Sequence, residues 1–138
     1  MTYLLDTNVI SAFRTKTGQA RLRPWLLRVG PEEFYLSVMT VGEVQRGIEK
    51  LRRTDASEAT KIEDWLAHIR TSFAARILPV DETAALQWGR FGQKARGDHA
   101  DALIAATALS RGMVLVTRNT KDFEPRGVQV VNPFGPPA

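Results

Sequence analysis

Four acidic residues occupy comparable places along the chain: Asp6, Glu43, Asp101 and Asp122. Asp6 and Asp122 come just after apolar runs that are typical of strands. Glu43 and Asp101 fall in the first turns of predicted helices. In an α/β protein these positions face one rim of the sheet, which is where such folds place their chemistry. We therefore take the four acids as a candidate site.

Carboxylates that gather at one rim repel one another and are stabilised by a hard cation. Magnesium is the expected ion, with manganese as the alternative, because both prefer oxygen ligands and share substrate phosphates. The chain carries a formal net charge of +4, which favours a polyanionic partner. The pattern thus predicts metal-assisted phosphodiester hydrolysis, in which the metal polarises the phosphate and activates a water molecule.

A simpler interpretation stays open for each acid. Acidic residues are common in first helical turns because of the helix dipole. Asp6 can cap the helix that follows it, and Asp101 can complete a capping box begun by Asp98. The set favours a site more than any single acid does, since Asp6, Asp101 and Asp122 each adjoin an apolar segment.

Short β-rich runs alternate with amphipathic stretches, which is the α/β pattern. Strands are predicted at residues 3–5, 34–36, 77–80, 114–117 and 128–131. Helices are predicted after a Thr7 or Asn8 cap, at 20–29, after Ser37 or Thr40, after Asp55 or Ser57, from Asp81 toward Ala95, and between Asp98 and Gly112. The first strand is expected to lie inside the sheet, which puts Asp6 at its carboxyl end.

Composition narrows the class of protein. With 138 residues, of which 43% are hydrophobic and 25% charged, the chain is expected to form one globular domain. No apolar run is long enough for a membrane span and the start lacks a signal-peptide pattern, so we expect a cytoplasmic protein without membrane contact. The absence of Cys removes thiolate zinc sites and thiol nucleophiles.

Segments 4–11, 37–44, 101–108 and 115–123 resemble a PIN domain, and the ending 131–134 is similar as well. More narrowly, the chain resembles the toxin ribonucleases of VapBC-type toxin-antitoxin pairs. The resemblance implies a single domain over residues 1–138, built as a three-layer α/β sandwich with a central parallel sheet of four to five strands flanked by helices. Residues 132–138 are expected to form an irregular tail. The resemblance also implies a magnesium-dependent endoribonuclease that cuts RNA, forms a homodimer and is inhibited by a cognate antitoxin protein.

The resemblance also assigns residues. Asp6, Glu43, Asp101 and Asp122 match the family's acidic, metal-binding cluster. Asn8, Thr117 and Asn119 match its supporting polar residues. The turn before Asp101 departs from the family pattern and leaves open whether Asp98 or His99 takes part. The basic residues nearest the predicted rim could hold RNA phosphates or be ordinary surface residues: Arg14, Arg96, Arg118 and Lys121.

Two other functions compete with a ribonuclease. A HAD-like phosphotransferase would use Asp6 as a covalent nucleophile, but that class needs a second Asp two residues on, where this chain has Asn8. A non-catalytic nucleic-acid-binding partner would use the acids only as helix caps. Metal-dependent cleavage of RNA by the purified protein separates these alternatives.

Overall fold

The computed structural model describes residues 1–92 and 99–135. Its centre is a five-stranded sheet with the order β3-β2-β1-β4-β5, in which every neighbouring pair is parallel. The strands are β1 Tyr3–Leu5, β2 Phe34–Ser37, β3 Ile77–Leu78, β4 Val114–Val116 and β5 Val130–Val131. Strand β1 is central, with Leu4 opposite Tyr35 on one side and Leu115 on the other. The predicted α/β fold with a central parallel sheet is confirmed.

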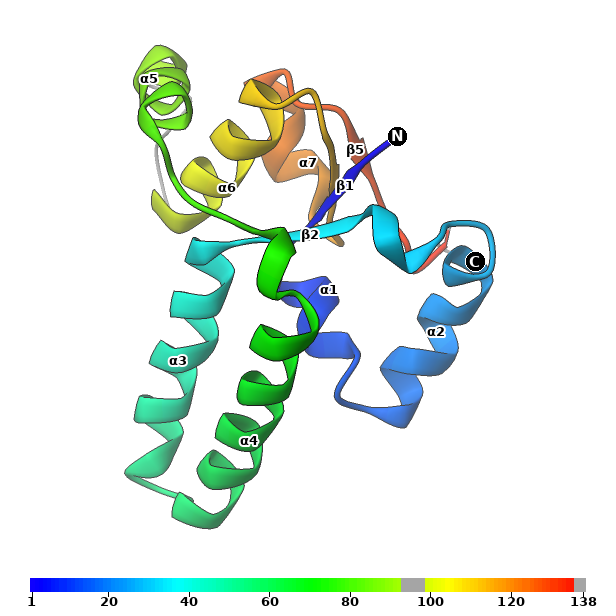
Figure 1. Cartoon of the computed structure of the whole chain (residues 1–138), viewed down its shortest axis with the longest axis vertical. Coiled ribbons are helices and arrows are strands. Elements are labelled where there is room, and N and C mark those ends of the chain that lie inside the picture. Colours follow the sequence, from blue (N-terminus) through cyan, green and yellow to red (C-terminus); the bar gives the residue numbers. More distant parts are fainter. Residues whose placement is uncertain (93–98, 136–138) are drawn as a thin grey trace.

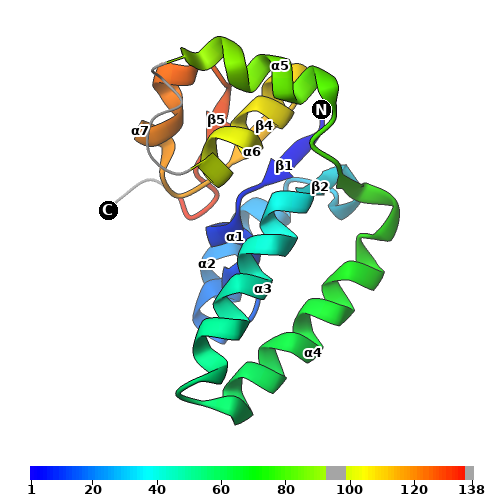
Figure 2. The same ribbon diagram turned by 90° about the vertical axis from the view of Figure 1, so that its left-hand side faces the viewer.

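The described helices surround this sheet: α1 Thr7–Ala12, α2 Lys16–Leu26, α3 Val38–Arg52, α4 Ala56–Ser72, α5 Glu82–Phe91, α6 His99–Ser110 and α7 Thr120–Phe123. Short 3-10 turns lie at Pro31–Glu33, Ala74–Arg76 and Glu124–Arg126. Helices α3 and α4 pack as a hairpin that extends away from the sheet, whereas α5 packs on α6 (Figures 1 and 2). No described helix is long and apolar enough to cross a membrane.

Side chains that alternate along the strands point to opposite faces of the sheet and so form two separate hydrophobic cores. Leu4 and Leu115 face α6 and α7, whereas Leu5 and Val116 face α1 and α2. Helix α6 is buried around most of its circumference, as its run of small apolar residues predicted. These two cores place helices on both faces of the sheet and leave its carboxyl edge to carry polar side chains.

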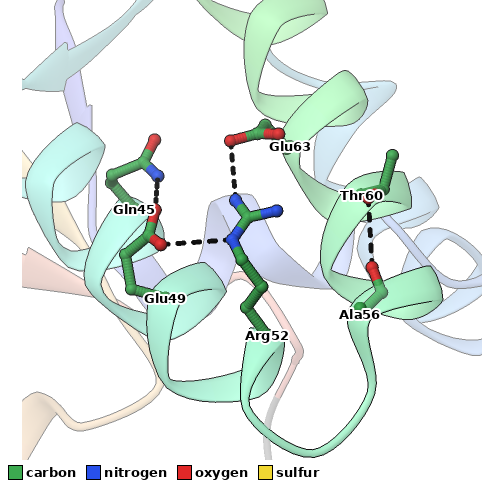
Figure 3. A network of polar contacts seen from close by, with 6 residues as sticks. All are labelled: Gln45, Glu49, Arg52, Ala56, Thr60 and Glu63. Carbon is green, nitrogen blue, oxygen red and sulfur yellow. Dashed lines mark hydrogen bonds and ion pairs between the residues drawn. The ribbon is translucent and has the colours of Figure 1, made fainter.

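Side-chain caps explain several helix starts. Ser37 accepts a hydrogen bond from the Met39 N–H at 3.0 Å, and Asp81 accepts one from the Ala84 N–H at 2.9 Å. Both caps were among those predicted. At the far end of the hairpin, Glu49 accepts hydrogen bonds from Gln45 and Arg52, and Arg52 also reaches Glu63 on α4 (Figure 3).

Some predicted element bounds are wrong for local reasons. The first helix is capped by Asp6 and not by Thr7 or Asn8, because it already begins at Thr7. Helix α2 begins at Lys16 instead of residue 20, because the Thr15 hydroxyl caps the Gly18 N–H at 3.0 Å. It ends at Leu26 instead of residue 29.

The other differences lie further along the chain. Helix α5 ends at Phe91 because Gly92 has a positive φ of 55°. Strand β3 ends before Pro79, which has no N–H to donate. Strands β4 and β5 are shorter than expected. The predicted cap Asp98 lies outside the described residues.

Candidate active site

Asp6 follows the central strand, as predicted, and is only 3% exposed. Its N–H continues the sheet ladder by donating to the Val116 carbonyl at 2.9 Å. One carboxylate oxygen accepts the Thr7 N–H at 2.8 Å, and the other accepts the Thr117 hydroxyl at 2.8 Å and the Asn8 side-chain amide at 3.4 Å. Asp6 is therefore both the cap of α1 and a buried carboxylate held in one orientation by groups from separate segments.

Thr117 is the residue that fixes Asp6 from the neighbouring strand. It is 0% exposed and directly follows β4. Its hydroxyl donates to Asp6 and accepts the backbone N–H of Asn119 at 3.0 Å. Asn8 lies 3.4 Å from the same hydroxyl, and its side-chain oxygen accepts the Arg118 N–H at 3.2 Å. The three polar residues predicted to support the site thus lie together, although Asn119 contributes its main chain here.

Thr7 links Asp6 to a second acid. Its hydroxyl donates to Glu43 Oε1 at 2.6 Å, while its backbone N–H donates to Asp6. The hydroxyl of Thr40, which is almost fully buried, lies 3.3 Å from the Thr7 hydroxyl. Glu43 comes from α3, so this short chain of bonds joins the end of β1 to the helix that follows β2. Sequence reasoning treated Thr7 only as a cap, and nothing local in the sequence signals its contact with Glu43.

The other two predicted acids lie on helices α6 and α7. Asp101 is half-buried in the first turn of α6, beside Ala100, which lines a cleft of about 540 Å³ together with Glu43. Asp122 is exposed on the short helix α7. In residues 1–92 and 99–135, no three Asp, Glu or His side chains are arranged as a preformed metal site. The structure thus brings Asp6 and Glu43 together through Thr7, and does not show a closed cluster of all four acids.

The side chains present still fit a divalent cation of the magnesium type. The side chains of the candidate ligands Asp6, Glu43, Asp101 and Asp122 offer carboxylate oxygens, and the Asp6 carboxylate is buried and held in place. Magnesium keeps much of its water shell and usually takes only one or two carboxylates plus substrate phosphate. A protein site of that kind requires no preformed group of three acids.

The predicted basic residues differ in what they contact. Arg14 pairs with Glu58 at 3.3 Å and lies over the Trp65 ring, so its charge is partly neutralised. Arg118 lies over the Phe134 ring, and Lys121 is exposed. Arg96, like Asp98, lies outside the described residues. The His99 ring meets the Trp88 ring edge-on, with 5.9 Å between their centroids.

The chain is similar to known proteins along most of its length. The PIN domain family model matches residues 3–125. The plasmid stability protein StbB of Pseudomonas syringae pv. tomato is 35% identical over 95% of this chain and 97% of its own length. The VapC ribonuclease Y4jK of Sinorhizobium fredii is 31% identical over 96% of this chain and 98% of its own. The crystal structure of FitAcB from Neisseria gonorrhoeae superimposes with a TM-score of 0.84 and 34% identity, covering 96% of this chain and 99% of that one.

The chain therefore belongs to the PIN-domain family. The narrower resemblance to VapC-type toxins, predicted from the sequence, is confirmed by the ribonuclease relative, which aligns along nearly the whole chain. The predicted parallel-sheet sandwich is likewise that of the structural neighbour.

Proposed function

We propose that this protein is a magnesium-dependent endoribonuclease that acts as the toxin of a toxin-antitoxin pair. The observation that carries the proposal is the pair Asp6 and Glu43, joined through Thr7 at the carboxyl edge of the sheet. A relative that aligns over 96% of this chain and 98% of its own length is named a VapC ribonuclease, which supports RNA as the substrate. The expected hydrolysis uses water as the nucleophile and forms no covalent enzyme intermediate.

In this mechanism the protein's own groups hold and orient the acids. Asp6 would be the main ligand of the ion, with Glu43 beside it and Asp101 and Asp122 as the further candidates. The bound ion would polarise the scissile phosphate and lower the pKa of a water molecule. Thr117 and Asn8 keep the Asp6 carboxylate in one rotamer, while Thr7 does the same for Glu43, so little reorganisation is needed when substrate binds. Glu43 or Asp122 would orient the attacking water.

The two competing functions fit less well. In a HAD-like enzyme a second carboxylate would act near Asp6, but Asn8 stands there and donates its amide to Asp6. If Asp6 were only a helix cap, its bond to the Thr7 N–H would suffice. The second oxygen is instead held by the fully buried Thr117, which directly follows strand β4, a contact that capping does not require.

An antitoxin protein is the proposed partner. FitAcB shows the same fold, and another structure of this fold, 26% identical, is a toxin-antitoxin complex from Klebsiella pneumoniae. The chain offers an apolar groove of about 500 Å³ between α1, α2 and α4, whose lining includes Ile10, Phe13, Leu26, Trp65, Ile69 and Phe73. Such a groove suits the apolar face of an amphipathic helix. A homodimer and a cytoplasmic location remain predictions, of which the first is checked by light scattering of the purified protein.

Cleavage of structured RNA by the purified, antitoxin-free protein tests the function. We expect cutting with Mg²⁺ or Mn²⁺ and none with EDTA, and a large loss of cutting in Asp6→Asn and Glu43→Gln. Glu49→Gln is the matched control, because it makes the same change on the same helix at an exposed position outside the site. RNA left intact by wild-type protein in both metals would overturn the proposal.

Metal binding can be measured without activity. An ion at a hundred times its dissociation constant should stabilise the folded protein by about 2.7 kcal/mol. Thermal unfolding should show this gain in wild type and Glu49→Gln, and Asp6→Asn should abolish it. A gain of equal size in Asp6→Asn would exclude Asp6 as the main ligand.

A further inference from the structure

The segment after β5 folds back and fixes an aromatic ring. Asn132 accepts the Phe134 N–H with its side-chain oxygen at 3.0 Å, which closes a tight turn around the buried Pro133. Phe134 is partly buried against the apolar cluster that includes Leu5 and Val116. The expected irregular tail therefore has a defined place for its ring, although residues 132–135 form no helix or strand.

Two arginines from distant segments lie over this ring. The guanidinium carbon of Arg21, on α2, is 5.0 Å from the Phe134 ring centroid, and that of Arg118, after β4, is 4.3 Å from it. Within the described part of the chain, neither arginine has a carboxylate within 4.0 Å, whereas Arg14 and Arg111 each have one. Two positive charges therefore lie near one ring without an acidic partner, and an anion beside them would reduce their mutual repulsion.

The same two arginines line one cleft of about 400 Å³. The rest of its wall is mostly small or polar: Asn8, Ser11, Ala12, Thr15, Thr17 and Gly18. In the wall of the cleft, the backbone at Gly18 lies close to the backbone at Ala12. A Cβ on Gly18 would lie only 2.2 Å from the Ala12 carbonyl oxygen. Guanidinium forks beside hydroxyl and amide groups are the chemistry that recognises phosphate.

The cleft adjoins the acidic site. Asn8 lines it, accepts the Arg118 N–H with its side-chain oxygen, and donates its amide to Asp6. If the scissile phosphate of an RNA strand lies at Asp6, a neighbouring phosphate of the same RNA strand would lie near Arg118 and Arg21. No acidic side chain lines this cleft among the described residues, in contrast to the cleft at Arg46 and Lys50, which contains Glu43.

We infer that Arg21 and Arg118, held by Phe134, form a binding subsite for a backbone phosphate of the RNA, next to the phosphate that is cut. The inference rests on the proposed function and deepens it. The ring orders both guanidinium groups before substrate arrives, so less side-chain entropy is lost on binding. The subsite would position the strand and take no part in the hydrolysis.

Binding of a short fluorescein-labelled single-stranded RNA, followed by anisotropy in EDTA, tests the subsite without cleavage. We expect Arg21→Gln and Arg118→Gln each to weaken binding about tenfold. Each should also make the slope of log affinity against log salt shallower by about 0.7, the value for one lost contact to a single strand. Arg23→Gln is the matched control, since Arg23 is exposed on the same helix and does not line the cleft.

Phe134→Leu tests the role of the ring, because it keeps apolar packing and removes the π face. It should weaken RNA binding while circular dichroism and the unfolding midpoint show a folded protein; wild-type affinity in this variant would refute the ring's role. Wild-type affinity and slope in both arginine variants would overturn the subsite, even if the protein cuts RNA. Arginine-dependent binding by a protein that never cuts RNA would keep the subsite and refute the ribonuclease.

Discussion

Replacing Thr117 by Val should measure how strongly the neighbouring strand holds the Asp6 carboxylate. The substitution keeps the shape of a fully buried side chain and removes one hydroxyl, which donates to Asp6 at 2.8 Å. Hydrogen bonds to charged groups contribute about 1.5–3 kcal/mol. The Asn119 N–H also loses its acceptor, but Asn119 is exposed and water can replace that bond. We therefore expect the free energy of unfolding to fall by about 2 kcal/mol.

Urea unfolding at neutral pH provides the measurement. With an ordinary dependence on denaturant for a domain of this size, the loss corresponds to a midpoint lower by roughly 1 M. Thr107→Val is the matched control, because Thr107 is equally buried and its hydroxyl donates only to the Leu103 carbonyl, one turn earlier in α6. That change should cost less than about 1 kcal/mol.

Equal losses in the two variants would refute the reasoning. They would mean that the cost comes from burying a methyl group in place of a hydroxyl, and not from the bond to a charged carboxylate. A midpoint raised by Thr117→Val would show that Asp6 is better accommodated without this donor, and the description of Thr117 as its support would then be wrong.

Two further predictions concern the close approach at Gly18 and the ion pair of Glu49 with Arg52 at the far end of the α3–α4 hairpin. Gly18→Ala should destabilise the protein by about 1–3 kcal/mol, because its Cβ would press on the Ala12 carbonyl, whereas Gly89→Ala meets open space and should stabilise by up to about 1 kcal/mol; chemical unfolding compares them. The hydrogen bond from Arg52 lowers the pKa of Glu49 below its ordinary 4.5. The stabilisation is therefore present above that value and is lost as pH falls through the lowered pKa. Arg52→Gln should move the pKa back up in an NMR titration, and an unchanged pKa would contradict the assignment.

Much of the fold could be predicted because its signals are local. The apolar run before Asp6 and the small apolar residues of α6 each indicate their element without reference to the rest of the chain. The predicted ends of helices were wrong where a single side chain or dihedral angle sets the end of the helix, as at the Thr15 cap of α2 and at Gly92 after α5. These are contacts of one hydroxyl or one peptide unit, which periodicity does not record.

The site was predictable in its residue types and less so in its connections. Asp6 at the end of a central strand follows from the apolar pattern, and the supporting Asn8 and Thr117 came from the family resemblance. The bond from Thr7 to Glu43 spans 36 residues, and the one from Thr117 to Asp6 spans 111. Such contacts depend on how the strands are ordered in the sheet, which no local pattern indicates. The same holds for the meeting of Arg21 and Arg118 at Phe134.

Because β1 is the central strand, we expect the acid that follows it to move less than the acids on the surrounding helices. Asp6 directly follows this strand and donates its N–H to the Val116 carbonyl, so we expect its amide to exchange with solvent only when the centre of the sheet opens. Asp122 sits on a four-residue helix near the sheet's outer strand β5, where local opening costs far less. If the acids draw closer around a bound ion, we therefore expect Asp122 to move and the Asp6 carboxylate to stay in place.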